Sequence, residues 1–320
     1  MKKIIKNIKF ISLVAAILIF SLLFSACSLK NSKDGKIKII ATLFPQYDFA
    51  RQIAKDKAEV TLLLPPGSEA HSFDPSANDM INISNSDIFL FTGKYMEPWA
   101  DRLISGIDNK TLIIKDLSQN IPLIKDEHDD SQEELSENEQ NTHEHEYDPH
   151  FWLDPTLASL MVDNILDALC QKDPDNSEFY KTNANDYKAK LKNLDNDFSE
   201  VVKNAKRNTI VFAGKFAHLY FVKRYNLNYQ AVLKNCSSQT EPSLQKLTYI
   251  INFIKENNIP VVYYEELSLS QTAKSICDNA NVKALKFSTI HNLSKEQFDN
   301  GITYMDLMKE NLENLKAGLN

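Results

Sequence analysis

Residues 178–207 have the sequence EFYKTNANDYKAKLKNLDNDFSEVVKNAKR, which is highly charged and contains neither glycine nor proline. Its apolar residues recur at helical spacing and would form one stripe: Tyr180, Tyr187, Leu191, Leu194, Phe198 and Val201. A helix of about 30 residues is roughly 45 Å long, enough to run the height of a protein of this size. We therefore expect these residues to form one long helix that connects two domains.

Short apolar stretches separated by helical patterns lie on both sides of this helix. The expected strands cover residues 36–44, 59–64, 87–93 and 112–115 before it, and residues 209–213, 229–233, 260–264 and 283–287 after it. Strands that alternate with helices predict βαβ units and parallel sheets, so the expected fold class is α/β. Ligands of such folds usually bind beyond the carboxyl ends of the strands, which predicts a site in the cleft between the two halves.

The long helix divides the chain into an N-terminal α/β lobe, residues 36–177, and a C-terminal α/β lobe, residues 208–320. Residues 126–148 interrupt the first lobe with eleven Asp or Glu residues, three histidines and no Lys or Arg. This composition is typical of a solvated, disordered loop.

The N-terminus has the features of a secretory signal. Four lysines precede an apolar stretch, residues 10–24, that is too short for a comfortable membrane span. The sequence LFSAC, residues 23–27, resembles a bacterial lipobox, whose cysteine becomes the lipidated first residue of the mature protein. We expect residues 1–26 to be removed, Cys27 to carry the lipid, and residues 27–35 to form a tether. The alternative is an uncleaved anchor helix, and both interpretations place the remaining chain on the extracytoplasmic face of the cell membrane.

Removal of residues 1–26 leaves 294 residues with 32 basic and 43 acidic side chains, a net charge of −11. This charge disfavours nucleic acid and anionic membrane surfaces as partners, and it suits the attraction of cations. None of the cysteines beyond Cys27 has a spacing typical of zinc sites, and the sequence leaves their pairing open: Cys170, Cys236 and Cys277.

Three of the seven histidines lie on loops at the ends of expected strands or helices. His71 follows the second strand and a Pro-Pro-Gly break, His150 lies before an expected helix, and His291 follows the last strand. Imidazole suits zinc, copper, nickel and iron, and manganese to a lesser degree. A lone loop histidine is more often simply exposed to solvent, so the motifs around these residues carry the argument.

Several distinctive motifs occur together in this chain. They are LPPGSEAH (residues 64–71), DPS (74–76), EPW (97–99), DPHFWLDP (148–155), EPS (241–243) and YMDLMKENL (304–312). In content and order they resemble the metal-binding lipoproteins of zinc and manganese ABC importers, a family that includes zinc-uptake binding proteins and streptococcal adhesins. The resemblance covers essentially the whole mature chain. It implies two Rossmann-like lobes with parallel sheets, joined by one rigid helix, with a metal site in the cleft between them.

The resemblance also implies a metal site of three histidines and one carboxylate. His71 and His150 match two of the family's histidines. Lys215 stands where the third is expected, and a protonated lysine cannot ligate a metal. The family's carboxylate aligns with His291, so we predict a site formed by His71, His150 and His291.

The fourth ligand is left open by the sequence. Water is one candidate, and an acid after the strand 260–264, Glu265 or Glu266, is another. His218 lies three residues beyond Lys215 and would need a shifted backbone to ligate, so a packed or solvated helix residue is the simpler interpretation. Lys215 is expected to form an ion pair, with Glu241 or another acid, that is either structural or holds the lobe closed.

The predicted function is capture of a divalent transition metal by a monomeric binding protein that delivers it to the permease of an ABC importer. Three histidines favour Zn²⁺ over Mn²⁺, which prefers more oxygen ligands. Binding should weaken at low pH because protons compete for the imidazoles. The acidic loop, residues 126–148, is either a solvated linker or a segment that collects zinc weakly.

Other functions remain as alternatives. Within the same family they are a manganese- or iron-binding relative and a surface adhesin. An extracytoplasmic metallohydrolase is the alternative of a different class. The chain contains no HExxH, GxSxG or glycine-rich phosphate motif, so we do not expect an enzyme.

Overall fold

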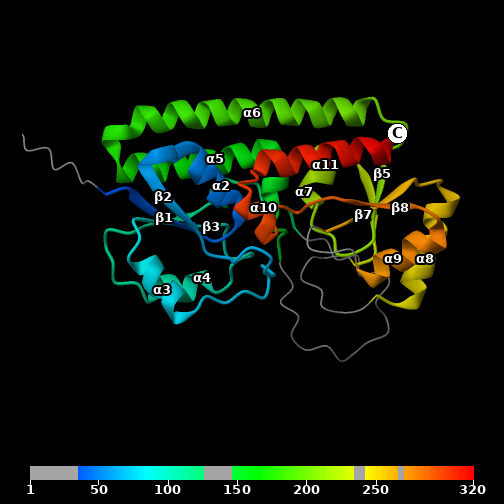
Figure 1. Cartoon of the computed structure of the whole chain (residues 1–320), viewed down its shortest axis with the longest axis horizontal. Helices are drawn as coiled ribbons and strands as arrows, with labels where there is room; N and C mark the ends of the chain where they lie inside the picture. Colours follow the sequence, from blue (N-terminus) through cyan, green and yellow to red (C-terminus); the bar gives the residue numbers. More distant parts are fainter. Residues whose placement is uncertain (1–34, 126–145, 234–241, 266–269) are drawn as a thin grey trace, which may run out of the picture. The chain divides into compact units, whose positions relative to one another are not determined.

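The long helix predicted from residues 178–207 is helix α6, Ser177–Lys203, in the computed structural model, which describes residues 35–125, 146–233, 242–265 and 270–320 (Figure 1). All of the predicted stripe except Val201, which is half-buried, lies on its buried face. The helix ends earlier than predicted, because the N–H groups of Lys206 and Arg207 donate to the carbonyl of Leu319 (3.1 and 3.3 Å) instead of continuing the helical pattern.

A four-stranded parallel sheet precedes α6 in the chain, and a second one follows it. The first has the order β2-β1-β3-β4, with β1 (Ile37–Ala41), β2 (Ala58–Leu62), β3 (Ile88–Phe91) and β4 (Ile113–Asp116). The second has the order β6-β5-β7-β8, with β5 (Thr209–Phe212), β6 (Asn228–Ala231), β7 (Val261–Tyr264) and β8 (Lys283–Lys286). The predicted α/β class with two parallel-sheet lobes is confirmed.

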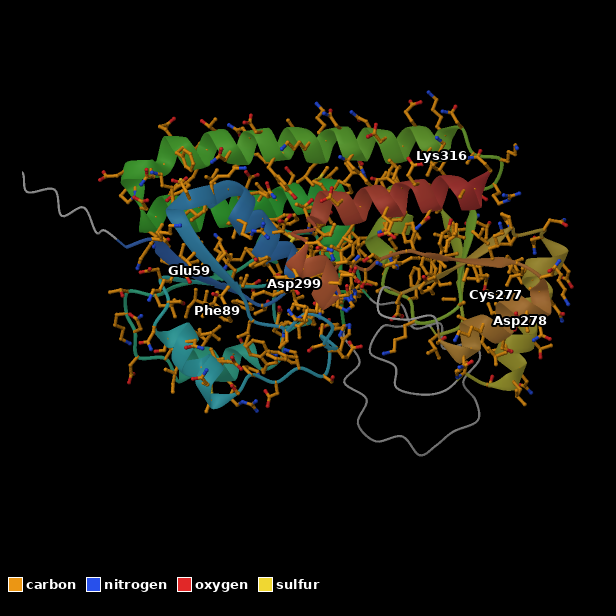
Figure 2. The ribbon with its side chains drawn as sticks, viewed as in Figure 1. Glu59, Phe89, Cys277, Asp278, Asp299 and Lys316 are labelled. Atoms are coloured by element: carbon orange, nitrogen blue, oxygen red, sulfur yellow. The ribbon has the colours of Figure 1, made fainter. Side chains whose placement is uncertain are left out.

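Helices cover both faces of the first sheet (Figure 1). They are α2 (Phe44–Ala54), α3 (Ala77–Ser84), α4 (Ala100–Ser105) and α5 (Pro155–Lys172). Phe89 and Phe91 pack with α3 and α4, whereas Ile88 and Leu90 pack with α2 and α5, because successive residues of a strand point to opposite faces. Phe89 is fully buried in this lobe, in contrast to the exposed Lys316 (Figure 2).

The second sheet has a similar arrangement. Its helices are α7 (Leu219–Arg224), α8 (Leu244–Glu256), α9 (Gln271–Ala280) and α11 (Tyr304–Leu319). Helix α10 (Lys295–Asp299) instead packs against α2, where the rings of Phe298 and Tyr47 have centroids 5.5 Å apart. Short 3-10 turns occur elsewhere in the chain at η1 (Lys55–Lys57), η3 (Phe151–Leu153) and η4 (Pro174–Asn176). Val211 and Val262 pack with α8 and α9 on one face of the sheet.

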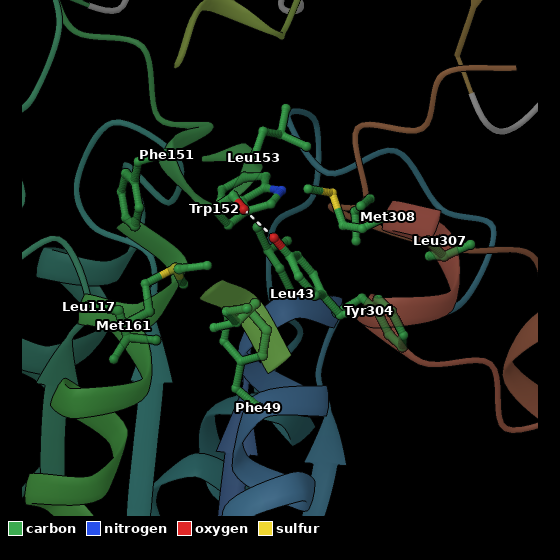
Figure 3. Packing of buried hydrophobic residues seen from close by; sticks show 14 of the residues in the cluster. Leu43, Phe49, Leu117, Phe151, Trp152, Leu153, Met161, Tyr304, Leu307 and Met308 are labelled. Atoms are coloured by element: carbon green, nitrogen blue, oxygen red, sulfur yellow. Dashed lines mark hydrogen bonds between the residues drawn. The ribbon is translucent and has the colours of Figure 1, made fainter. Parts of the chain in front are cut away.

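The opposite face of the second sheet belongs to a core that both lobes share. One cluster of buried side chains contains Ile39 and Leu90 of the first sheet, Phe212 and Tyr263 of the second, and Phe198 of α6. Part of this cluster, around Trp152 and Tyr304, is drawn in Figure 3. The two sheets are therefore joined by packed side chains as well as by α6.

Residues 37–320 form one compact unit, distinct from residues 1–36. The predicted signal and Cys27 lie outside the described residues, as do the three histidines of the acidic loop and Cys236. Cys170 and Cys277 are free thiols. In the part of the chain that the structure describes, no helix is both long and apolar enough to cross a bilayer.

Candidate metal site

The loop after β2 carries His71 and contains a tight turn. Gly67 has a φ of +84°, a conformation that glycine adopts without steric cost, and its N–H donates to the carbonyl of Leu293 (2.8 Å). The carboxylate of Glu69 accepts a hydrogen bond from the backbone N–H of His71 (3.2 Å). The loop that carries the half-buried His71 is thus bound to a segment close to the C-terminus.

His150 is fully buried and directly precedes the turn η3. Asp148 contacts it twice, since Oδ1 accepts the backbone N–H of His150 (2.7 Å) and lies 3.0 Å from its Nδ1. The ring of Trp152 packs against the imidazole, with 5.2 Å between ring centroids. Trp152 is itself held, because its Nε1 donates to the carbonyl of Thr289 (2.8 Å) and its carbonyl accepts from the hydroxyl of Tyr304 (2.6 Å; Figure 3). Trp152 therefore supports the His150 loop.

His291 lies in the segment that leaves β8. Ile290, directly before it, has a φ of +61°, which is uncommon for a β-branched residue and strains the backbone. The hydroxyl of Thr289 lies 2.6 Å from Nδ1 of His291. The carbonyl of His291 accepts from the N–H of Phe44, at the start of α2 (3.2 Å). These contacts fix the backbone on both sides of the imidazole.

Asn292 joins the loops of His291 and His71. Its Nδ2 donates to the carbonyls of Pro65 (3.1 Å) and Ser68 (2.6 Å), both in the loop after β2. Asn292 is fully buried. The Asn292 side chain therefore connects the two loops directly through hydrogen bonds.

The three predicted ligands come together from these separate loops. The ring centroids are 5.6 Å apart for His71 and His150, 6.0 Å for His71 and His291, and 6.4 Å for His150 and His291. Three imidazoles on one tetrahedral zinc would have centroids roughly 5 Å apart, given a Zn–N distance of about 2 Å. Among the described residues, no three His, Cys, Asp or Glu side chains already stand close enough to hold a metal ion. A zinc site at these histidines therefore requires the rings to approach by roughly 1 Å.

The segment after β5 contains Lys215 and His218. Lys215 is half-buried, and its predicted partner Glu241 lies outside the described residues, so that ion pair stays a prediction. His218 is fully buried, with its ring stacked on Phe212 (4.8 Å between centroids) and 5.0 Å from that of Phe287. This is the packing of a core histidine, and we keep His218 out of the candidate ligand set.

Glu265, one of the predicted fourth ligands, directly follows β7. Its Oε1 lies 3.7 Å from the position that a Cβ would take on Gly214, which follows the neighbouring strand β5 by two residues. The carboxylate therefore lies at the carboxyl ends of the two central strands of the second sheet. Glu266, the other candidate acid, is outside the described residues.

Comparison with known proteins assigns this arrangement to a family. A family profile described as "zinc-uptake complex component A periplasmic" matches residues 39–318. The chain belongs to this zinc-uptake family. The profile spans both lobes and all three candidate histidines.

Individual relatives agree with the profile. The chain is 35% identical over 289 residues to the high-affinity zinc uptake system protein ZnuA of Bacillus subtilis, covering 90% of this chain and 89% of that protein. It is 33% identical over 309 residues to the zinc-binding lipoprotein AdcA of Streptococcus pneumoniae, and this match spans 60% of the relative's length. The crystal structure of the Zn(II)-bound ZnuA-like domain of S. pneumoniae AdcA has a TM-score of 0.74 at 30% identity, covering 89% of this chain and 99% of that domain.

Glu97 is distinctive in the sequence only as part of the EPW motif, residues 97–99. The structure shows it fully buried beyond β3, where its carboxylate accepts hydrogen bonds from the hydroxyls of Thr42 and Thr92 and the N–H groups of Thr92 and Gly93. Burial nevertheless raises the pKa of Glu97 to about 7. Thr42 and Thr92 follow the two central strands β1 and β3, so Glu97 joins the carboxyl ends of these strands.

Proposed function

We propose that this protein captures zinc outside the cytoplasm and delivers it to the permease of an ABC importer. The observation that carries the proposal is the group of three imidazoles, from His71, His150 and His291, whose ring centroids lie within 6.4 Å of one another. The family is that of a zinc-uptake complex component, a solute-binding protein, and the relatives are named for zinc binding or uptake.

Zinc fits this donor set better than manganese does. Neutral imidazole nitrogens suit Zn²⁺, whereas Mn²⁺ prefers more oxygen ligands. Zinc takes four ligands in a tetrahedral arrangement. The fourth position would be filled by water or by Glu265, whose carboxylate lies beside Gly214.

Capture would require a small contraction of the three loops and no wide lobe closure. The loops of His71 and His291 are already joined through Asn292, and those of His150 and His291 through the bond from Trp152 to Thr289. Zinc would draw the imidazoles together, and the permease would recognise the contracted form.

The location follows from the N-terminal sequence. The lipobox-like residues 23–27 support cleavage before Cys27 and lipid attachment to its thiol. A relative is named a zinc-binding lipoprotein, which supports the same anchor. The protein would then act as a monomer on the extracytoplasmic face of the membrane. Residues 126–148 would be either a solvated linker or a segment that binds zinc weakly and raises its local concentration.

A competition titration with a chromophoric zinc chelator tests the proposal. Residues 28–320 contain the whole compact unit and avoid the signal. We expect one tightly bound zinc per chain. We expect His71→Ala, His150→Ala and His291→Ala each to weaken binding by more than about 100-fold, the upper end of what loss of an outer-shell partner costs.

Glu59→Ala, at an exposed position on β2, is the control and should bind zinc as the wild type does. Unchanged affinity in the His291 variant would move the third ligand elsewhere. Absence of any bound first-row metal in the wild type would refute metal capture.

A further inference from the structure

Two of the three candidate ligands have a polar side chain two residues earlier that contacts the same ring nitrogen. Asp148 Oδ1 lies 3.0 Å from Nδ1 of His150, and Thr289 Oγ1 lies 2.6 Å from Nδ1 of His291. In both imidazoles Nδ1 contacts a neighbouring side chain, so a metal held by either ring would be bound through Nε2.

Asp148 is held in place independently of any metal. Its N–H donates to the carbonyl of Ile124 (3.0 Å), and its carbonyl accepts from the hydroxyl of Tyr220 on α7 (3.0 Å). Its side chain also accepts the backbone N–H of His150 (2.7 Å), which closes a tight local turn. A carboxylate fixed in this way sets the direction of the imidazole beside it.

Thr289 is also fixed by its surroundings. It is 1% exposed, and its carbonyl accepts the indole N–H of Trp152. Asn311 makes two hydrogen bonds to the backbone of Ser288, the residue before Thr289. Its Oδ1 accepts from the Ser288 N–H (2.7 Å), and its Nδ2 donates to the Ser288 carbonyl (2.8 Å). The hydroxyl of Thr289 therefore has a defined position relative to His291.

We propose that Asp148 and Thr289 are positioning residues that make His150 and His291 bind the metal through Nε2. The inference rests on the proposed function, because it concerns the same site. A carboxylate that accepts the Nδ1–H fixes the tautomer of the imidazole and makes Nε2 a stronger donor, whereas a hydroxyl orients the ring with a smaller electronic effect. The Asp148–His150 pair is accordingly the stronger determinant of zinc affinity.

The test combines zinc affinity with the tautomer of each histidine, read from ¹⁵N chemical shifts of metal-free protein, residues 28–320. In the wild type we expect the Nδ1–H tautomer of His150. Asp148→Ala should lower zinc affinity by about 10- to 100-fold and mix the tautomers. Thr289→Val, which keeps the shape of the side chain, should lower affinity less, and Thr289→Ser should restore it.

Asp116→Ala is the matched control for loss of a turn-forming aspartate. Asp116 accepts from the N–H and hydroxyl of Ser118 two residues later, just as Asp148 accepts from His150, but it lies at the end of β4. This variant should keep wild-type zinc affinity.

The outcomes separate the two proposals. Tight zinc binding with an Nε2–H tautomer of His150, or with unchanged affinity in Asp148→Ala and Thr289→Val, overturns the positioning role and leaves zinc capture standing. A wild-type protein that binds no zinc overturns both.

Discussion

At the scale of single residues, the buried carboxyl group of Glu97 has a pKa well above its value in water. Burial raises its pKa from 4.5 to about 7, even though the hydrogen bonds that it accepts from Thr42, Thr92 and Gly93 favour the charged form. The folded protein therefore holds this proton more tightly than the unfolded chain does. The resulting stabilisation is complete below about pH 4.5 and is lost as the pH rises through about 7.

We predict that Glu97→Gln makes the stability of the protein less dependent on pH. The wild type should lose roughly 3 kcal/mol from this group between pH 4.5 and pH 8, an amount that the uncharged glutamine does not lose. Urea unfolding of both proteins at several pH values measures the difference. Parallel stability curves for the two proteins would show that Glu97 titrates normally.

The sequence predicted the chemistry-bearing residues better than their partners. His71, His150 and His291 were found because motifs surround them, and the structure brings their rings together. The contacts that Thr289 and Asn292 make could not be predicted, since their partners lie far away in the sequence or depend on the strained backbone at Ile290. His218 was ambiguous because helical spacing cannot show whether a ring packs against Phe212.

At the scale of elements, the loops that carry His71 and His291 are hydrogen-bonded to each other. Asn292 connects the segment after β8 with the loop after β2, and the Gly67 N–H bond to Leu293 supports the same connection. The hydrogen bonds between these two loops should therefore determine how closely the imidazoles of His71 and His291 approach each other.

We predict that Asn292→Ala lowers both stability and zinc affinity. The variant loses the two hydrogen bonds between the loops and the one that the Asn292 side chain accepts from the N–H of Leu293, which should cost about 1–3 kcal/mol in unfolding free energy. Zinc affinity should fall because the two loops separate. Asn109→Ala is a matched control, since Asn109 Nδ2 also donates to a backbone carbonyl, that of Ser84 (2.8 Å), away from the histidines. Thermal unfolding of both variants measures the change in stability, and zinc titration measures the change in affinity. An Asn292 variant that is destabilised but binds zinc normally would show that this connection is only structural.

The elements themselves were largely predictable, because buried parallel strands are continuous apolar runs and α6 has one apolar stripe. All eight predicted strands occur in the structure. The ends of elements were predicted less well. Helix α6 stops before residue 207, because the N–H groups of Lys206 and Arg207 donate to the carbonyl of Leu319.

At the scale of the whole molecule, the shared core limits how far the two sheets can separate. Buried side chains of both sheets and α6 belong to one cluster, so a wide opening would expose apolar surface to water. We predict that small-angle X-ray scattering curves of metal-free and zinc-bound protein are the same within error. The acidic segment also contributes to the radius of gyration, so the same measurement is made on a variant without residues 126–145, in which only the two lobes contribute. A clear decrease in radius of gyration on zinc binding in that variant would instead demonstrate large hinge closure.

The most direct test of the central claim is a crystal structure of the zinc-loaded protein, with anomalous diffraction measured on both sides of the zinc absorption edge. We predict one strong anomalous peak, bonded to nitrogen atoms of His71, His150 and His291 at about 2.0–2.1 Å, with water or a carboxylate as the fourth ligand. A peak at any other set of residues, or no peak in crystals grown with stoichiometric zinc, would contradict the proposed site.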